Sequence, residues 1–407
     1  MQRGNIGSVI IAGAGPVGLL TALFLGQRGI PVDVVEAATE VNDAPRGLAY
    51  GPAAVSVLAR AGILENVIER GFIPADVSWR KPSGEWLVGL ERLNNMVDGL
   101  PNTVILPVGA LSTLLVEEVQ KYSSVTIHWG HRVLVASQTE EKAWVEVEEQ
   151  KSKATRRMEA DFVIGCDGAS SAVRKSISGS NFPGWTWPNQ LVAVNARMNF
   201  DKLNFSDVQW VVDPENWFVI AKIDKGGLWR IVYGEPAGLS VEEIKSRLPD
   251  RLRTTFPGNP EPSEYQVTNV TPYVCHQRCA EKMRDNRILL AGDAAHLNNP
   301  MGGLGLTTGV CDVGSLVDCL YGIDSGEATL DILNKYDEIR RQIFDRVVDT
   351  MSTANFKRIM QGAAEFQESD LSYKMIMAAR TDISITTAMR KHDMSIGCDM
   401  TQFYNKH

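Results

Sequence analysis

The stretch that decides the fold is Ser8–Ala38, with the sequence SVIIAGAGPVGLLTALFLGQRGIPVDVVEAA. A short apolar strand leads into a turn with the spacing G-x-G-x-x-G, Gly13–Gly18, and then into a helix that we expect to end before Gly29. A second apolar strand ends at Glu36, where an acid would accept hydrogen bonds from a ribose. This order is typical of a Rossmann unit that binds a dinucleotide. An ordinary βαβ unit with a glycine-rich turn is the alternative.

The residues of this turn have separate predicted roles. Gly13 makes the tight turn, Gly15 lets a pyrophosphate approach the backbone, and Gly18 lets the helix pack closely on the strand. The free N–H groups at the start of the helix, around Pro16 and Val17, would bind the phosphates.

Two more apolar strands end in acidic turns, far along the chain. The sequence DFVIGCDGASSAVRKSI, residues 161–177, passes from a strand into Asp167-Gly168 and then into a helix that contains Arg174. The sequence RILLAGDAAHLNNPMGGLGL, residues 287–306, passes from a strand into Gly292-Asp293 and a glycine-rich loop. The structural alternative for both acids is a helix cap, with Arg174 pointing to water.

In this order and spacing the three motifs resemble the flavoprotein monooxygenases of the para-hydroxybenzoate hydroxylase type. Arg46-Gly47 and LNKYDEIRR, residues 333–341, resemble two further segments of that family. The resemblance covers about residues 8–180 and 265–350. It implies FAD as the cofactor and NADPH or NADH as the co-substrate.

The resemblance also assigns parts of the chain to the flavin. It implies that Asp293 accepts hydrogen bonds from the ribityl chain, and we expect Asp312, on the next helix, to matter far less for FAD binding. A glycine-rich loop would then pass under the isoalloxazine, since side chains there would hold the backbone off the ring. The start of the following helix would stabilise negative charge on the reduced ring. The loop residues expected at the flavin are Pro300, Gly303, Gly305, Leu306 and Thr307.

Four further positions follow from the same resemblance. Asp167 and Arg174 are expected near the pyrophosphate and in support of the reduced nicotinamide nucleotide. Arg46, followed by Gly47, is expected to reach the FAD. Val108 stands where the family often has Arg or Gln, so one polar contact to the flavin is missing or comes from elsewhere.

We expect a mixed α/β fold in which a Rossmann-like FAD-binding domain is interrupted by an antiparallel sheet and followed by helices. The FAD-binding domain is assigned to residues 1–75, 103–180 and 268–330, the substrate-binding sheet to 76–102 and 181–267, and the C-terminal helical region to 331–407.

The substrate sheet is predicted from VQWVVDPENWFVIAKIDKGGLWRIVYGE, residues 208–235, which alternates in polarity like antiparallel strands. Such a sheet would roof the flavin. The candidate pocket residues are Trp217, Lys222, Arg230 and Tyr233. Arg230 and Tyr233 are the candidate catalytic residues, as groups that make a phenol more electron-rich; for each of the four, sheet packing or solvent exposure is the alternative.

Composition excludes several classes of protein. With 41 Lys and Arg against 49 Asp and Glu the net charge is −8, which disfavours a nucleic-acid or anionic-membrane surface. Six cysteines in 407 residues favour reduced, cytoplasmic thiols, and Cys275-His276 with Cys279 lacks the second ligand pair of a metal site. Val9–Leu25 imitates a signal peptide but is interrupted by glycines, and we expect no other stretch of membrane-span length. Oligomeric state is left open.

The resemblance implies a monooxygenase that uses NAD(P)H and O2 to hydroxylate or epoxidise a small aromatic or phenolic substrate through a C4a-hydroperoxyflavin. A reductase or halogenase with the same FAD fold is an alternative, although GWTWPNQ, residues 184–190, does not match the halogenase pattern Trp-x-Trp-x-Ile-Pro. A different class, an FAD-holding protein with poor turnover, stays open.

Overall fold

The computed structural model describes residues 4–42, 47–91 and 96–405. One half of the molecule is built on a six-stranded sheet, in which five strands run parallel and β19 pairs antiparallel at one edge. Parallel strands buried on both faces are apolar throughout, and every residue of β1 and β13 is buried. In sheet order the strands are β19 (Arg284–Asp285), β20 (Ile288–Leu290), β13 (Phe162–Gly165), β1 (Val9–Ala12), β2 (Val32–Glu36) and β9 (Val125–Trp129).

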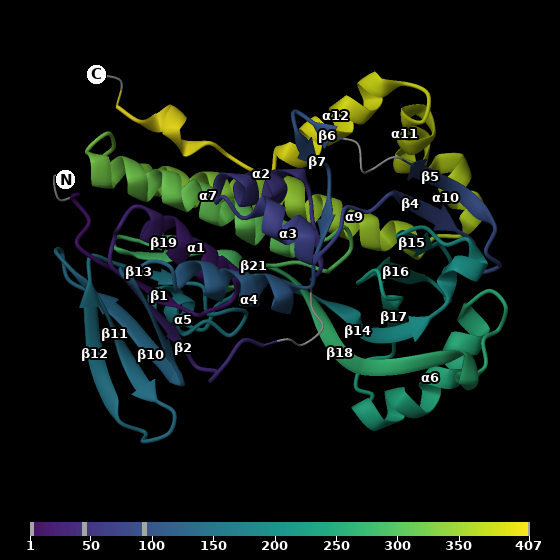
Figure 1. The fold of residues 1–407 in the computed structure, drawn as a ribbon, viewed down its shortest axis with the longest axis horizontal. Coiled ribbons are helices and arrows are strands. Elements are labelled where there is room, and N and C mark those ends of the chain that lie inside the picture. The colour runs from purple at the N-terminus through teal and green to yellow at the C-terminus, as the bar shows by residue number, and fades with distance from the viewer. Residues whose placement is uncertain (1–3, 43–46, 92–95, 406–407) are drawn as a thin grey trace.

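Helices and a second small sheet enclose these strands (Figure 1). Helix α1 packs between α4 and α7, while the three-stranded antiparallel sheet β10–β12 packs against β1, β2 and β13. The elements are α1 (Pro16–Gln27), α2 (Pro52–Arg60), α3 (Leu64–Arg70), α4 (Val108–Val119), α5 (Ala172–Ser178), α7 (Leu304–Ser325), β10 (His131–Gln138), β11 (Ala143–Glu149) and β12 (Thr155–Ala160). The predicted strand, turn, helix and strand of residues 8–38 are confirmed, with α1 ending at Gln27.

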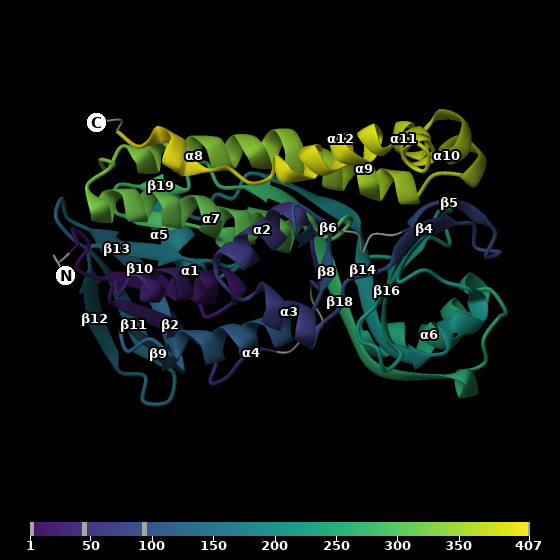
Figure 2. The same cartoon turned by 45° about the horizontal axis from the view of Figure 1, so that its top comes forward.

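The other half is an eight-stranded mixed sheet with α6 (Val241–Thr255) on one face. The turn Lys225–Gly227 joins two of its strands, as the alternating pattern predicts. Its strands are, in sheet order, β21 (His296–Leu297), β18 (Tyr265–Cys279), β14 (Gly184–Met198), β17 (Leu228–Glu235), β16 (Phe218–Lys222), β15 (Val208–Val211), β4 (Asp76–Arg80) and β5 (Trp86–Glu91). The long strands β14 and β18 reach from this sheet toward the first half (Figure 2). Two small ribbons complete the strands: β3 (Ala49–Tyr50) with β8 (Val104–Ile105), and β6 (Met96–Val97) with β7 (Leu100–Pro101).

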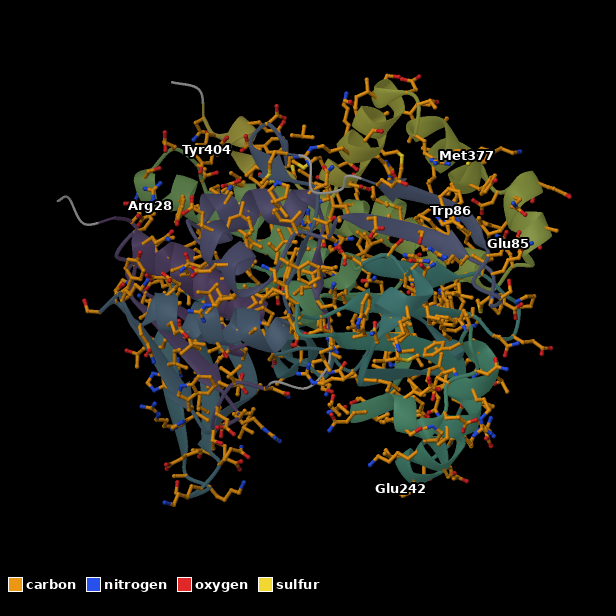
Figure 3. The ribbon with its side chains drawn as sticks, turned by 45° about the vertical axis from the view of Figure 1, so that its right-hand side comes forward. Arg28, Glu85, Trp86, Glu242, Met377 and Tyr404 are labelled. Atoms are coloured by element: carbon orange, nitrogen blue, oxygen red, sulfur yellow. The ribbon has the colours of Figure 1, made fainter. Side chains whose placement is uncertain are left out.

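Helices of the C-terminal region run along one side of both halves (Figure 2). Helix α8 continues through a π-helical turn, Phe344–Asp349, into α9, so this part of the C-terminal region is helical, as expected. Helix α11 packs on β5, and Trp86 of β5 and Met377 of α11 are labelled in this part of the molecule (Figure 3). The bounds are α8 (Ile332–Ile343), α9 (Thr350–Ile359), α10 (Ala363–Ser369), α11 (Leu371–Ala379) and α12 (Ile383–Met394).

One expectation about membrane-span length is wrong. Helix α7 has 22 residues and is apolar enough to cross a membrane, although 89% of its most apolar window is buried inside the protein. Its apolar side chains therefore serve the core, in contact with α1, α2 and α8.

Candidate functional site

The three motif turns meet at one edge of the six-stranded sheet. Ala12 at the end of β1 pairs with Gly165 of β13, which pairs with Leu290 of β20. Because parallel strands end at the same edge, the turns after them are neighbours. The Cys166 N–H donates to the Ala12 carbonyl at 2.8 Å, which ties two of these turns together directly.

The first turn is shaped for close approach. Gly13 has φ +101°, and a Cβ there would lie 2.5 Å from the Cys166 carbonyl oxygen; a Cβ on Gly18 would lie 2.0 Å from the Gly13 carbonyl oxygen. A Cβ on Gly15 would meet nothing within 4 Å, so the space above it is open. Pro16 starts α1, and no side chain caps the helix. The open space and the uncapped N–H groups form a phosphate-sized site of the kind predicted.

Glu36 closes the side of this turn. One carboxylate oxygen accepts the Ala14 N–H and the other accepts the Ala38 N–H, both at 2.7 Å. Two backbone donors thus fix the carboxylate beside the turn, and each oxygen retains a lone pair for a further donor.

Asp167 caps a helix, and Arg174 is directed inward. The Asp167 carboxylate accepts the Ser171 hydroxyl at 2.5 Å and the Ala172 N–H at 2.7 Å at the start of α5. Burial raises the pKa of Asp167. Arg174 is 3% exposed and donates to the carbonyls of Ala294 and Ala169, at 2.8 and 2.7 Å. The cap that was the structural alternative for Asp167 is therefore present. The other part of that alternative, that Arg174 points to water, is wrong, because its guanidinium supports the turn that holds Asp293.

The Gly292-Asp293 turn lies against the first motif. Val17 of α1 would be 2.9 Å from a Cβ on Gly292, so helix and turn are in direct contact. Asp293 is exposed and lies inside a 3₁₀ turn, Gly292–Ala294, whose N-cap is Ala291. The alternative role of Asp293 as a helix N-cap is therefore not realised.

The glycine-rich loop ends at an uncapped helix. Gly303, with φ +68°, is the N-cap of α7 and offers no side chain to its N–H groups. Gly47 lies against Leu306, where a Cβ would be 3.3 Å from the Leu306 side chain, and the Thr307 hydroxyl accepts the Gly51 N–H at 3.1 Å. The segment after residue 46 therefore packs on the start of α7.

Three other predicted positions lie near these turns. Val108 is the first residue of α4, and its N–H donates to the Gly47 carbonyl at 3.0 Å. Pro300 is exposed, and a Cβ on Gly305 would lie 3.1 Å from Asn298 Oδ1. Arg46 lies outside the described residues.

The eight-stranded sheet separates the four candidate pocket residues onto two faces. Residues directly opposite each other on antiparallel strands share a face. Tyr233 pairs with Phe218 and Lys222 with Trp229, and the core beneath α6 contains Phe218, Trp229 and Tyr233. Tyr233 is 1% exposed and Lys222 forms an ion pair with Asp207 at 3.6 Å. Tyr233 and Lys222 thus face α6, away from the motif turns.

Arg230 and Trp217 lie toward the opposite face. Arg230 pairs with Ala221, which packs with Leu48 and Ile105 next to Gly47. Trp217 belongs to a buried cluster that contains Met301 of the glycine-rich loop. Of the four candidates, these two approach the start of α7.

Arg230 is a buried cation. It is 6% exposed and its Nε donates to Asn195 Oδ1 at 2.7 Å. Burial lowers its pKa to about 10, partly offset by Tyr273, so the guanidinium stays charged at neutral pH.

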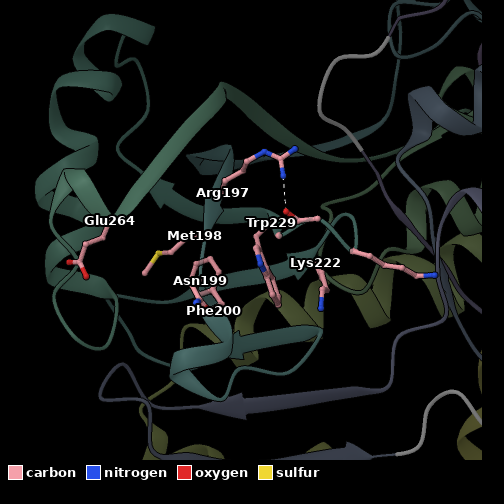
Figure 4. A pocket seen from close by; sticks show the side chains of 10 residues that line it. Arg197, Met198, Asn199, Phe200, Lys222, Trp229 and Glu264 are labelled. Atoms are coloured by element: carbon pink, nitrogen blue, oxygen red, sulfur yellow. Dashed lines mark hydrogen bonds between the residues drawn. The ribbon is translucent and has the colours of Figure 1, made fainter.

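A shallow hollow of about 510 Å³ lies elsewhere (Figure 4). Its lining includes Arg197, which donates to the Gly226 carbonyl at 2.8 Å, as well as Lys222 and Trp229. Since Trp229 faces α6, this hollow is separate from the region around α7.

Comparison with known proteins shows the family of this chain. The family model for the FAD binding domain matches residues 7–351. The chain belongs to the FAD-dependent aromatic monooxygenases of the para-hydroxybenzoate hydroxylase type. A para-nitrophenol 4-monooxygenase of Pseudomonas sp. (strain WBC-3) is 38% identical over 353 residues, 86% of this chain and 87% of the relative. A 6-hydroxy-3-succinoylpyridine 3-monooxygenase of Pseudomonas putida is 35% identical over the same length, 86% of this chain and 88% of the relative.

Solved structures agree with this membership of the monooxygenase family. The crystal structure of p-nitrophenol 4-monooxygenase from Pseudomonas putida DLL-E4 aligns with a TM-score of 0.88 at 35% identity, over 96% of this chain and 98% of that one. An aklavinone-11 hydroxylase in complex with FAD and aklavinone aligns with a TM-score of 0.76 at 21% identity, over 93% of this chain and 73% of that one, which supports the fold.

FAD, the family's cofactor, fits the edge where the motif turns meet. The open space over Gly15 and the two uncapped helix starts offer backbone donors to a long anionic ligand. Asn298 Oδ1 is buried and has no protein partner among the described residues, so a donor of a bound ligand would satisfy it. This set of unsatisfied groups lies where the predicted cofactor residues are.

Sequence reasoning missed the buried network behind this monooxygenase site. Asp312, on α7, is 0% exposed; it accepts the Gly292 N–H at 2.9 Å, His296 Nε2 lies 2.7 Å away, and Arg340 Nε donates at 2.6 Å. Arg340 is also fully buried and donates to the carbonyls of Thr308 and Ile396. Asp312 is therefore no inert neighbour of Asp293, because it holds the adjacent residue in place. The apolar surroundings of Asp312 in the sequence, GVCDVG, were the one available signal.

Proposed function

We propose that this monooxygenase acts on a hydroxylated aromatic ring that carries a substituent para to the hydroxyl group. The names of the two relatives share this feature. Para-nitrophenol has its nitro group, and 6-hydroxy-3-succinoylpyridine its succinoyl group, on the ring carbon para to the hydroxyl, and in both names the oxygenated carbon is that same position.

The observation that carries the proposal is Arg230 on the sheet face directed to the start of α7. A buried cation favours the ionised form of a phenol held beside it. An ionised hydroxyl group makes the ring more electron-rich, above all at the ortho and para carbons. We therefore propose that Arg230, held by Asn195, binds the oxygen of the substrate hydroxyl group and stabilises its deprotonated form.

Aromatic side chains would enclose the rest of the ring. Trp187, Trp217 and Phe356 form a buried cluster, with ring centroids 4.4 Å apart for Trp187 and Phe356 and 5.4 Å apart for Trp217 and Phe356. Met301 joins this cluster from the glycine-rich loop. We propose that the cluster shields the ring from water.

The remaining assignments follow the predicted roles. When bound, FAD supplies the activation of O2 with electrons from NADPH or NADH. We assign the six-stranded sheet with its flanking segments to FAD, the eight-stranded sheet to the substrate, and residues 331–407 to a helical region that spans both. Gly13, Gly15, Pro16, Val17, Gly18 and Glu36 would hold the adenosine side, and Asp293 with the start of α7 the flavin side. A cytoplasmic location stays a prediction.

The proposal is tested with FAD-loaded protein, NADPH or NADH, O2 and matched ligands. Para-nitrophenol and a 3-acyl-6-hydroxypyridine should stimulate cofactor oxidation and give oxygenated product. Para-nitrotoluene, which lacks the hydroxyl group, should give neither. Product from para-nitrotoluene at a similar rate, or no product from any hydroxylated ring, would contradict the proposed substrate class.

A further inference from the structure

A chain of hydrogen bonds connects the glycine-rich loop to the C-terminal helices. Asn355 Nδ2, on α9, donates to the Met301 carbonyl at 3.3 Å, and Arg358 donates to Asn355 Oδ1 at 2.5 Å. Arg358 Nε lies 3.0 Å from both carboxylate oxygens of Asp370. The side chains of this last pair are 15% and 9% exposed, so water screens their attraction little.

Both ends of this series of hydrogen bonds are held in place by further contacts. At the loop end, Gly302 has φ +102°, and a Cβ there would lie 2.7 Å from Asn355 Nδ2, so the amide sits directly against the loop backbone. At the other end, Asp370 is the N-cap of α11 and accepts the N–H groups of Ser372 and Tyr373 at 2.8 and 3.1 Å. Helix α11 in turn packs on β5, the edge of the eight-stranded sheet.

This part of the chain lies outside the family match. The model for the FAD binding domain ends at residue 351, whereas the three linking residues are at 355, 358 and 370. At the loop, the series of hydrogen bonds ends on Met301, which belongs to the aromatic cluster proposed to enclose the substrate.

We infer that Asn355, Arg358 and Asp370 are positioning residues, a relay through which helix α11 holds the Met301 backbone and so fixes the substrate side of the glycine-rich loop. The part that concerns substrate rests on the proposed function. If the Met301 backbone were held less firmly, the aromatic cluster would widen. We therefore expect loss of the relay to raise the KM for the substrate and to lower the fraction of NAD(P)H oxidation that yields product, and to change kcat less.

The test uses two helix caps that differ in one respect. Asp370→Asn keeps an N-cap residue on α11 but removes the charge that holds Arg358. The matched control is Asp382→Asn, because Asp382 caps α12 by accepting the Ser384 N–H at 2.8 Å and, among the described residues, forms no hydrogen bond or ion pair with Arg358 or the loop. In FAD-loaded protein, amide hydrogen exchange of residues 299 and 301–303 should be about fivefold faster in Asp370→Asn. This is the factor for loss of one hydrogen bond, because release of Arg358 is expected to free Asn355 from the Met301 carbonyl. Exchange in Asp382→Asn should match the wild type.

A second variant keeps the inference falsifiable. Asn355→Ala removes the contact with the loop and leaves the cap of α11 intact, and it should accelerate exchange in the same residues. Equal exchange in Asp370→Asn and Asp382→Asn would overturn the relay, and so would faster exchange in Asn355→Ala alone. Hydrogen exchange is measured without turnover. The relay can therefore be disproved while the proposed substrate class stands, and the substrate class can be disproved while the relay stands.

The kinetic readout then separates positioning from simple destabilisation. With a turned-over substrate and at a temperature well below the melting temperature of the variant, Asp370→Asn should raise KM severalfold and divert NADPH oxidation to hydrogen peroxide. An unchanged KM and an unchanged yield of product per NADPH would overturn the substrate part of the inference.

Discussion

Arg230 is the residue on which the substrate proposal depends, and its charge can be measured through a bound ligand. An opposite charge within about 4–6 Å lowers the pKa of an acid by about 1–3 units. We therefore expect the pKa of para-nitrophenol bound to Arg230→Gln to lie about 1–3 units above its value in the wild type. The ionised ligand absorbs visible light, so a pH titration of the complex reports the shift directly.

A matched variant controls for loss of surface charge. Arg157 forms an exposed ion pair with Glu159, with both side chains about half exposed, so Arg157→Gln should leave the pKa of the ligand unchanged. The same ligand pKa in Arg230→Gln and in the wild type would remove Arg230 from the substrate site.

The buried carboxylate of Asp312 should make the stability of the fold depend on pH. Burial alone would raise its pKa, but His296 and Arg340 lower it to about 2. Because the folded pKa lies below the unfolded value of about 3.9, Asp312 stabilises the fold above pH 4, and this stabilisation is lost as the pH falls through 2. Asp312→Asn should lose about 3 kcal/mol of unfolding free energy at pH 7, since it also leaves Arg340 as a buried charge.

Urea unfolding at pH 7, 4 and 3 checks this dependence, with the exposed Asp331 changed to Asn as the control. The gap between wild type and Asp312→Asn should narrow below pH 4. A gap that stays constant down to pH 3 would show that Asp312 is not ionised in the fold at neutral pH.

At the start of helix α7, we expect Gly305 to affect the affinity for FAD more than the stability of the fold. This residue lies inside a helix, where alanine is favoured over glycine by about 1 kcal/mol. Gly305→Ala should therefore change the melting temperature of the FAD-free protein little, because this gain offsets the close approach of the new Cβ to Asn298 Oδ1, at 3.1 Å. If the flavin lies against this backbone, the added methyl group should raise the Kd for FAD at least about tenfold.

The control is Gly362→Ala, where a Cβ would meet nothing within 4 Å and which lies at the N-cap of α10. Fluorescence titration of the FAD-free protein with FAD measures both constants. Equal FAD affinity in the two variants would show that the start of α7 does not contact the cofactor.

The sequence carries one G-x-G-x-x-G fingerprint, Gly13–Gly18, which we assign to FAD, so we expect NAD(P)H to bind without a fingerprint of its own. We expect NAD(P)H to meet the flavin transiently, and we expect substrate to control that meeting through its different affinity for two arrangements of the site. Anaerobic stopped-flow reduction of bound FAD by NADPH should be slow without substrate and at least about tenfold faster with it. Equal rates would reject such control.

The sequence alone determined the features that depend on local backbone chemistry. Gly13 needs a positive φ, apolar runs such as Val9–Ala12 form buried parallel strands, and α1 ends at Gln27 before a glycine. These constraints act within a few residues, so the α/β fold and the three motif turns could be predicted from the order of the residues.

Only the tertiary structure shows which side chains, distant in the sequence, lie close together. Alternation along β17 shows that Arg230 and Tyr233 lie on opposite faces, but only the packing of α6 on one face and of the glycine-rich loop on the other shows which face carries the site. Asp312 of α7 is joined to Arg340 of α8, and Met301 of the glycine-rich loop is joined to Asp370 through Asn355 and Arg358 of α9. Long-range pairing of buried polar groups depends on how elements pack, and no local pattern encodes the partner of a buried charge.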